Sequence, residues 1–215
     1  MQYRALICDL DGTLVDSLPG IEASSRHAVT VCLPDSTLPP MRSIIGPPIA
    51  KMFAGLWPHL GPDELGKLVS EFRVHYDREG CITAELYAGV ADTLTSLADR
   101  GVTLFVLTNK PIAATRKILG HFGLLTQFRD VIAPDSGEPP FRSKPEGARF
   151  LQARHNLDPS STAIIGDGID DLAAARECGF SFVLADYGYG SASTRAVDGS
   201  TDKVASTFAD VLSFL

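Results

Sequence analysis

Two carboxylates that directly follow an apolar run restrict the possible folds of this chain more than any other feature. The run Ala5-Leu6-Ile7-Cys8 ends at Asp9, and Asp11 follows two positions later, beside Gly12 and Thr13. An apolar run that stops in this way is typical of a strand buried on both faces. Unpaired carboxylates beside a hydrophobic core are costly or lose their charge. Either these residues form an ordinary turn, or a metal ion or a reaction stabilises the pair.

The same arrangement recurs twice further along the chain. The apolar run 102–107 ends at Thr108, and the run 163–165 leads within two residues to Asp167. Polar residues therefore follow three expected strands at the same topological position. Because ligands bind outside the carboxyl ends of the strands in parallel sheets, we expect four residues to lie at one edge of the sheet: Asp9, Asp11, Thr108 and Asp167.

Strands and helices are expected to alternate through most of the chain. The expected strands cover 3–8, 102–107, 130–133, 162–165 and 180–185, and the expected helices cover 90–100, 111–122, a segment after 145, 170–178 and a terminal segment from about 203. Such alternation gives a parallel sheet with right-handed crossovers. We predict an α/β protein with a Rossmann-like, three-layer parallel sheet core.

Residues 17–83 interrupt this alternation. Apolar residues recur at mostly helical spacing from Ile44 to Leu56 and from Leu65 to Tyr76. These helices are punctuated by prolines, among them Pro34, Pro39, Pro40, Pro58 and Pro62. We predict a small helical cap domain at 17–83, inserted into a catalytic core made of 1–16 and 84–215.

Composition excludes several classes of protein. The net charge of -7 argues against non-specific nucleic-acid binding, which depends on cationic neutralisation of phosphates. No apolar stretch approaches the length that spans a membrane, and the start of the chain has too few apolar residues for a signal peptide. The four cysteines are scattered without a zinc-like spacing. We expect a cytoplasmic protein, a monomer or weak homodimer, that acts on a small molecule and binds neither nucleic acid nor membranes.

The polar motifs taken in order resemble the four motifs of the haloacid dehalogenase superfamily. These are Asp9-x-Asp11-Gly-Thr, Thr108-Asn109, Lys144-Pro145 and Gly166-Asp167-x-x-x-Asp171, and together they extend over nearly the whole chain. Local matches at 11–17, 45–49, 107–111 and 188–191 resemble the phosphoglycolate phosphatase-like group within that superfamily.

The resemblance implies roles for the acidic residues. Asp9 would be the nucleophile that forms an aspartyl-phosphate, and Asp11 would act first as general acid and then as general base. Mg²⁺, which prefers hard oxygen ligands, would be held by Asp9, the backbone carbonyl of Asp11 and Asp167. Asp171 would support the metal from outside its ligand shell, with the adjacent Asp170 as the alternative.

The remaining site residues would bind the substrate. The resemblance implies that Thr108 and the backbone of Asn109 hydrogen-bond phosphoryl oxygens, and that Lys144 screens the charge of Asp9 and the phosphate. Arg42, in the expected cap, is ordinarily a solvated helix charge. Its guanidinium also suits recognition of a second carboxylate or phosphate on the substrate.

These features predict a Mg²⁺-dependent phosphatase that hydrolyses a small phosphomonoester through an aspartyl-phosphate, with phosphoglycolate-like substrates favoured. A nucleoside monophosphate phosphatase (5'-nucleotidase), a pyrophosphatase or a phosphosugar mutase of the same superfamily remains an alternative. A phosphoaccepting module similar to response-regulator receivers is the alternative from another class. A receiver, however, needs neither the late Asp167 and Asp171 nor a helical insert.

Overall fold

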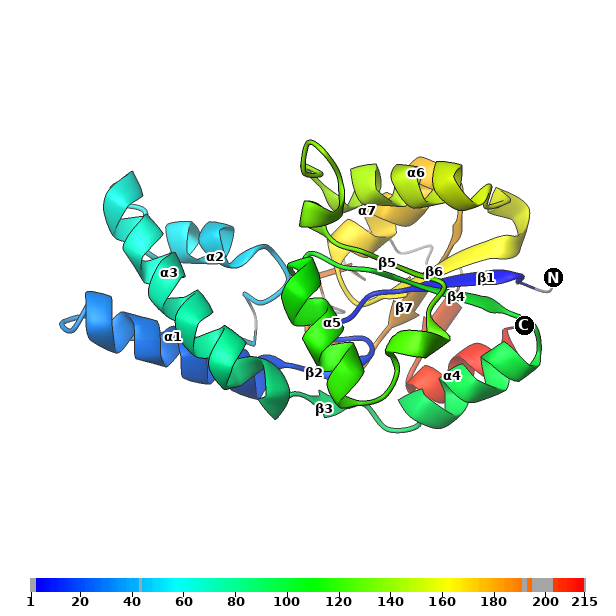
Figure 1. Cartoon of the computed structure of the whole chain (residues 1–215), viewed down its shortest axis with the longest axis horizontal. Coiled ribbons are helices and arrows are strands. Elements are labelled where there is room, and N and C mark those ends of the chain that lie inside the picture. The colour runs from blue at the N-terminus through cyan, green and yellow to red at the C-terminus, as the bar shows by residue number, and fades with distance from the viewer. Residues whose placement is uncertain (1–2, 43, 191–192, 195–202, 215) are drawn as a thin grey trace. The chain divides into compact units, whose positions relative to one another are not determined.

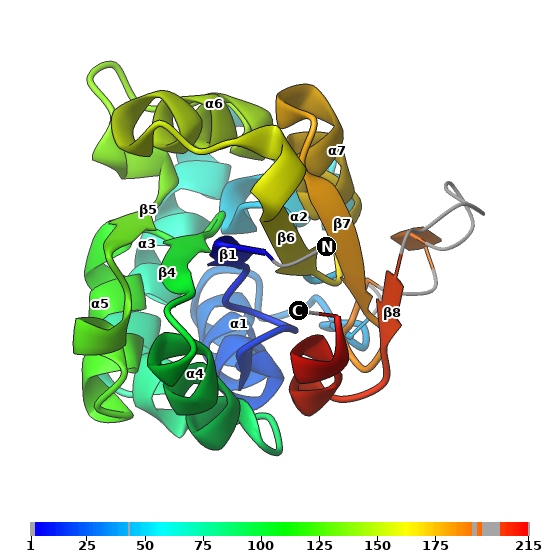
Figure 2. The same ribbon diagram turned by 90° about the vertical axis from the view of Figure 1, so that its right-hand side faces the viewer.

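A six-stranded parallel sheet organises the larger of the two units into which the chain divides (Figures 1 and 2). The computed structural model describes residues 3–42, 44–190, 193–194 and 203–214, so Ser191 of the 188–191 match lies outside the described residues. The larger unit comprises 1–16 and 86–215, and the smaller comprises 17–85. In spatial order the strands are β5 (Asp130–Ile132), β4 (Thr103–Leu107), β1 (Ala5–Cys8), β6 (Thr162–Gly166), β7 (Ser181–Ala185) and β8 (Lys203–Ala205).

Helices cover both faces of the sheet, which gives the three layers predicted from the sequence. Figure 2 shows α6 (Lys144–His155) and α7 (Ile169–Cys178) along one face, and α4 (Val90–Asp99) and α5 (Ile112–His121) along the other. The predicted α/β class is therefore confirmed. Short 3-10 turns complete the unit at Leu125–Gln127, Pro134–Ser136, Pro159–Ser161 and Phe208–Ser213.

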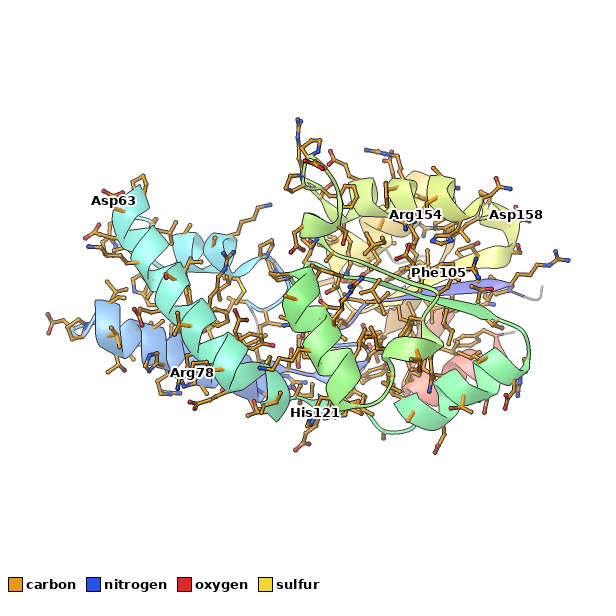
Figure 3. All side chains as sticks on the ribbon, in the orientation of Figure 1. Asp63, Arg78, Phe105, His121, Arg154 and Asp158 are labelled. Carbon is orange, nitrogen blue, oxygen red and sulfur yellow. The ribbon has the colours of Figure 1, made fainter. Side chains whose placement is uncertain are left out.

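Apolar strands form at the centre of the sheet because side chains on both sides of these strands are buried under helices. All residues of β1 and β6 are buried. Alternate strand residues such as Ile7 and Phe105 pack against α6 and α7 in one core cluster. The outer surface contrasts with this core: Phe105 is 1% exposed, whereas the Arg154 side chain on α6 is 55% exposed. Both residues are labelled in Figure 3.

The register of the sheet brings the ends of three strands together. Cys8 of β1 lies beside Val106 of β4 on one side and Ile165 of β6 on the other. The chain order reverses at β1, since its neighbours β4 and β6 lie on opposite sides. Crevices that bind ligands form at such a switch point in open α/β sheets.

Three helices make up the smaller unit. They are α1 (Leu18–Cys32), α2 (Ile49–Leu56) and α3 (Pro62–Arg78), and the 3-10 turn η1 (Gly80–Thr83) follows them. An edge-to-face contact of Phe53 with Phe72 ties α2 to α3, and Phe53 makes a second such contact with Trp57 at the end of α2. The two-residue strands β2 (Val15–Asp16) and β3 (Glu85–Leu86) pair with each other where the chain passes between the units. No helix in the described ranges is both long enough and apolar enough to cross a lipid bilayer.

The prediction of a terminal helix from about residue 203 is wrong. Residues 203–205 form β8, which pairs in parallel with β7 in the register Val183↔Lys203, and only a 3-10 turn follows. The Asp210 carboxylate accepts hydrogen bonds from the backbone N–H groups of Ser206 and Thr207 at the start of that turn. The exposed edge of β7 offers backbone partners to the tail, and this tertiary pairing overrides its helical pattern.

Candidate active site

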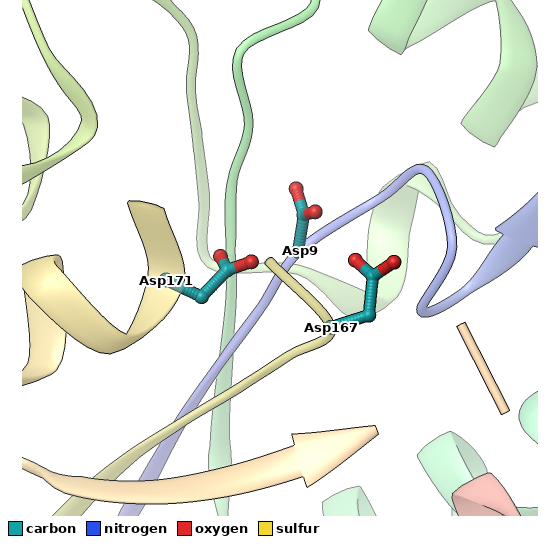
Figure 4. Close-up of side chains that lie close together, drawn as sticks. All are labelled: Asp9, Asp167 and Asp171. Atoms are coloured by element: carbon teal, nitrogen blue, oxygen red, sulfur yellow. The ribbon is translucent and has the colours of Figure 1, made fainter. Parts of the chain in front are cut away.

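Three aspartates gather at the carboxyl end of the sheet (Figure 4). Asp9 follows β1, Asp167 follows β6, and Asp171 lies in the first turn of α7. One carboxylate oxygen from each lies within 4.8 Å of the others, and all three residues are buried. These residues are far apart in the sequence, so only the parallel register of β1 and β6 places them together.

Lys144 supplies the positive charge at the centre of this group. It is the first residue of α6, and its side chain is 2% exposed. Its Nζ atom lies 2.7 Å from Oδ1 of Asp9 and 2.6 Å from Oδ1 of Asp171. A buried ammonium is tolerated when it is paired in this way. The structure therefore joins the cation of the third motif to acids of the first and fourth.

The acids are poised near neutral pH when no metal is bound. Burial, together with the neighbouring Asp171 carboxylate, raises the pKa of Asp9 to about 7 against the opposing effect of Lys144. Burial and the Asp9 carboxylate raise the pKa of Asp167 to about 6. Burial also raises the pKa of Asp171 to about 6, although Lys144 works against it. Burial by itself would lower the pKa of Lys144, but its ion pairs with Asp171 and Asp9 raise it overall.

Glycines allow the backbone to close around the acids. A Cβ atom at Gly12 would lie 2.4 Å from Oδ2 of Asp167, and one at Gly188 would lie 2.2 Å from the Asp167 Cβ. Gly12 also has a φ of 80°, which disfavours other residues. The backbone N–H of Gly190 donates a 2.8 Å hydrogen bond to Oδ2 of Asp167. These close approaches fix the Asp167 carboxylate in position.

The donor set fits a hard divalent cation. Three carboxylates converge on one place, and the single buried ammonium that contacts them leaves their charge only partly balanced. Mg²⁺ commonly binds through one or two carboxylates together with substrate phosphate and water. Asp9 and Asp167 could hold such an ion, whereas Asp171 is engaged by Lys144 and by the backbone N–H of Gly168 at 3.1 Å.

The structure separates the neighbours Asp170 and Asp171. Asp171 points into the acid group, while Oδ2 of Asp170 accepts a 2.8 Å hydrogen bond from the side-chain amide of Asn109. Asn109 thus joins the loop after β4 to the start of α7. Thr108, which is 3% exposed, follows β4, and its Oγ1 accepts a hydrogen bond from the backbone N–H of Lys110.

Asp11 has a partner that the sequence reasoning did not assign. Nζ of Lys110 lies 3.0 Å from Oδ2 of Asp11. The sequence position of Lys110, directly after the Thr108-Asn109 motif, could have indicated a role in the site. A lysine in a loop, however, is usually a solvated charge. Only the fold shows that its side chain is buried, at 7% exposure. Arg42 is exposed in the smaller unit, and its proposed contact with substrate stays a prediction.

Comparisons with known proteins identify the family of this chain. A family model described as haloacid dehalogenase-like hydrolase matches residues 3–179. A phosphoglycolate phosphatase of Haemophilus influenzae is 28% identical over 100% of this chain and 99% of its own length. The tyrosine-protein kinase PtkA of Mycobacterium tuberculosis is 33% identical over 88% of this chain and 64% of its own length. A crystal structure of a predicted phosphoglycolate phosphatase from Haemophilus somnus superposes with a TM-score of 0.85 at 27% identity, covering 100% of this chain and 98% of the other.

Proposed function

The chain belongs to the haloacid dehalogenase-like hydrolase family and is a phosphatase, and on that premise we propose that it hydrolyses a small phosphomonoester metabolite, phosphoglycolate being favoured, with Mg²⁺ and through an aspartyl-phosphate. The observation that carries the proposal is the pairing of Asp9 with the buried ammonium of Lys144, 2.7 Å away, beside two further acids. Lys144 favours the charged form of this buried carboxylate, against the effect of burial, and would place a cation beside an arriving phosphate.

In the proposed reaction an oxygen of Asp9 attacks phosphorus, and the bond from phosphorus to the leaving oxygen breaks. The leaving oxygen departs with the electron pair and takes a proton from Asp11. Water then attacks the aspartyl-phosphate and gives a proton to Asp11, which releases inorganic phosphate and restores the Asp9 carboxylate. General acid–base help of this kind typically contributes about 10² to 10⁴ in rate.

The other groups lower the cost of bringing two anions together. Lys144 neutralises charge on Asp9 and on the phosphoryl group, and Thr108 and the Asn109 backbone donate hydrogen bonds to phosphoryl oxygens. When bound, Mg²⁺ would supply further positive charge for the phosphate and would be held by Asp9, Asp167 and the backbone carbonyl of Asp11. Asp171 orients Lys144, which it contacts directly.

The helical unit has no evident part in phosphoryl transfer, so we assign substrate choice and exclusion of water to it. This assignment makes 17–83 a cap domain and 1–16 with 84–215 the catalytic core. We also infer a reducing compartment such as the cytoplasm, because Cys8, Cys32, Cys81 and Cys178 are all free and three of them are buried.

The test is phosphate release over a panel that contains phosphoglycolate, nucleoside monophosphates, pyrophosphate and sugar phosphates. We expect repeated turnover with Mg²⁺, with the highest kcat/KM for phosphoglycolate or another small anionic phosphomonoester. The Asp9→Asn variant is the negative control on every substrate.

The panel also separates the alternatives. Preference for nucleoside monophosphates or pyrophosphate would overturn the proposed substrate but keep the mechanism. Isomerised sugar phosphate in place of free phosphate would indicate a mutase. At most one phosphorylation per chain, without turnover, would indicate a receiver-like module and would overturn the proposal as a whole.

A further inference from the structure

A second buried lysine stands beside the acid group. Of the lysines in the described residues, Lys110 and Lys144 are the two that are buried, and both contact acids of the site. They have different partners: Lys144 joins Asp9 to Asp171, whereas Lys110 contacts Asp11 at 3.0 Å. In the first motif, Asp9 therefore pairs with Lys144, and Asp11 pairs with Lys110.

The backbone of Lys110 is anchored on both sides. Its N–H donates a 3.1 Å hydrogen bond to Oγ1 of Thr108, and its carbonyl accepts a 3.3 Å bond from Oγ1 of Thr115. Both hydroxyl-bearing residues are buried. Pro111 and the start of α5 follow immediately, and the fixed φ of proline stiffens this exit. The ammonium group thus contacts Asp11 from a backbone position that has little freedom to move.

Charge balance alone does not account for this lysine. Burying an ammonium carries a desolvation penalty that a single ion pair often fails to offset. The Asp11 side chain is 19% exposed, so it retains contact with solvent and does not need a buried cation to be accommodated. What the pair does provide is a fixed orientation for the Asp11 carboxyl group, because the ammonium that contacts it is itself buried.

We propose that Lys110 is a positioning residue that holds the carboxyl of Asp11 in line with the leaving oxygen of the substrate. The inference rests on the proposed function, in which Asp11 donates the proton that the leaving oxygen needs. Lys110 itself forms no bond to the substrate and transfers no proton. Its contribution is geometric, since small misplacements of a catalytic group are costly in rate.

The test compares phenyl phosphate with p-nitrophenyl phosphate in wild type and Lys110→Met. The two substrates have similar size and the same charge, but p-nitrophenolate leaves without needing a proton, whereas phenolate needs one. We use kcat/KM because it reports the steps up to release of the leaving group and excludes hydrolysis of the phosphoenzyme. Lys110→Met should lose roughly tenfold to a hundredfold more kcat/KM on phenyl phosphate than on p-nitrophenyl phosphate.

Two further variants test whether Lys110 acts through Asp11. Asp11→Asn should show the same selective loss, and adding Lys110→Met to it should cause little further loss. Lys110→Arg keeps a cation that can pair with a carboxylate and should recover part of the selectivity. Lys203→Met is the matched control, because Lys203 contacts the carbonyl of Phe214 and the ring of Tyr3 instead of the site, and it should leave both substrates unaffected.

The outcomes are distinguishable. Equal loss on both substrates in Lys110→Met, or full additivity with Asp11→Asn, would overturn the positioning role, because a structural or phosphate-binding lysine gives those results. Failure of the wild type to turn over either substrate would count against the proposed function itself. Thermal unfolding of Lys110→Met beside Lys203→Met shows whether any loss reflects folding.

Discussion

Asp9, Asp167 and Asp171 are held together against their mutual repulsion. All three are buried with oxygens within 4.8 Å of each other, and their pKa values are raised to about 7, 6 and 6. Raised pKa values in a cluster of carboxylates mean that protonation of the metal-free site is favoured over the fully charged form. A site with this property is well suited to exchange those protons for a divalent cation.

The first prediction concerns the division of labour between the acids of the first motif. Asp11→Asn should accumulate phosphoenzyme during turnover, because the base that activates water is lost while the nucleophile remains. Asp9→Asn, which differs by the same chemical change two residues away, should form no phosphoenzyme and should lose several orders of magnitude in rate. Intact-protein mass after acid quenching measures the phosphoenzyme. Retention of more than about a tenth of the wild-type rate in Asp9→Asn would contradict the mechanism.

The second prediction concerns the metal requirement. Asp167→Asn should raise the Mg²⁺ concentration needed for half-maximal activity more than Asp171→Asn does, because Asp171 already pairs with Lys144 at 2.6 Å. Asp171→Asn should instead lower thermal stability, since it leaves a buried ammonium with one carboxylate partner fewer. Titration of activity with Mg²⁺ and thermal unfolding of the same samples measure both effects. Equal metal requirements in the two variants would argue against these roles.

Most of the site was readable from the sequence because its residues lie at the ends of apolar runs. Strand ends of one parallel sheet meet at one edge, so Asp9, Thr108 and Asp167 could be placed together without a structure. Lys110 could not be assigned in this way, because nothing in the sequence shows that a loop lysine is buried. The choice between Asp170 and Asp171 depends on which face of α7 turns inward, and the residues alone leave it open.

At the scale of elements, the parallel core was predictable and parts of the helical unit were not. Helix α1 was not predicted as a helix of its own, because its buried face consists largely of small residues, Gly20, Ser24, Ser25 and Ala28, instead of a large apolar stripe. Small residues let helices approach closely but leave no strong periodicity to read. The strand β8 was missed because its pairing with the edge of the sheet is a tertiary interaction, which the local sequence pattern of 203–205 does not show.

The third prediction tests the close approach at α1. A Cβ at Gly20 would lie 2.0 Å from the backbone carbonyl oxygen of Gly80, so Gly20→Ala should destabilise the protein by about 1–3 kcal/mol. The matched control is Gly66→Ala within α3, where a Cβ meets nothing within 4 Å. That change should stabilise by about 0.5–1 kcal/mol. Urea unfolding of both variants measures the difference, and stabilisation by Gly20→Ala would show that α1 and η1 are not packed as described.

The fourth prediction concerns substrate choice by the helical unit. Arg42→Ala should weaken kcat/KM for phosphoglycolate by about 1.5–3 kcal/mol, the loss expected for a charge-assisted hydrogen bond. Hydrolysis of p-nitrophenyl phosphate, which carries no second anionic group, should be nearly unchanged. Measuring kcat/KM for both substrates with the Arg42→Ala variant tests whether Arg42 contacts the substrate. Parallel loss on both would assign Arg42 to stability of its own unit, and no loss on either would make it a solvated surface charge.

For the whole molecule, the cluster links folding, pH and metal binding. The three buried carboxylates have pKa values of about 6 to 7 in the folded protein, against an ordinary value of 3.8 for aspartate. Between these values the folded state binds more protons than the unfolded state, so its stability falls as pH rises. This contribution is fully present below about pH 3.8 and is lost as pH passes through about 6 to 7.

The fifth prediction follows from this decrease in the cluster's contribution to stability as pH rises. Without metal, the cluster should make the protein less stable near pH 7.5 than near pH 5, and Mg²⁺ should raise the Tm more at the higher pH, because there it need not displace protons. Carboxylates outside the cluster, such as Asp210, whose pKa is lowered by hydrogen bonds, work in the opposite direction. The wild type is therefore compared with Asp167→Asn, which keeps these carboxylates and removes one buried acid. Thermal unfolding at both pH values, with ionic strength matched by NaCl, measures the effect. Equal stabilisation by Mg²⁺ at both pH values, or the same pH dependence in the two proteins, would show that the aspartates are neither protonated nor exchanged for metal as argued.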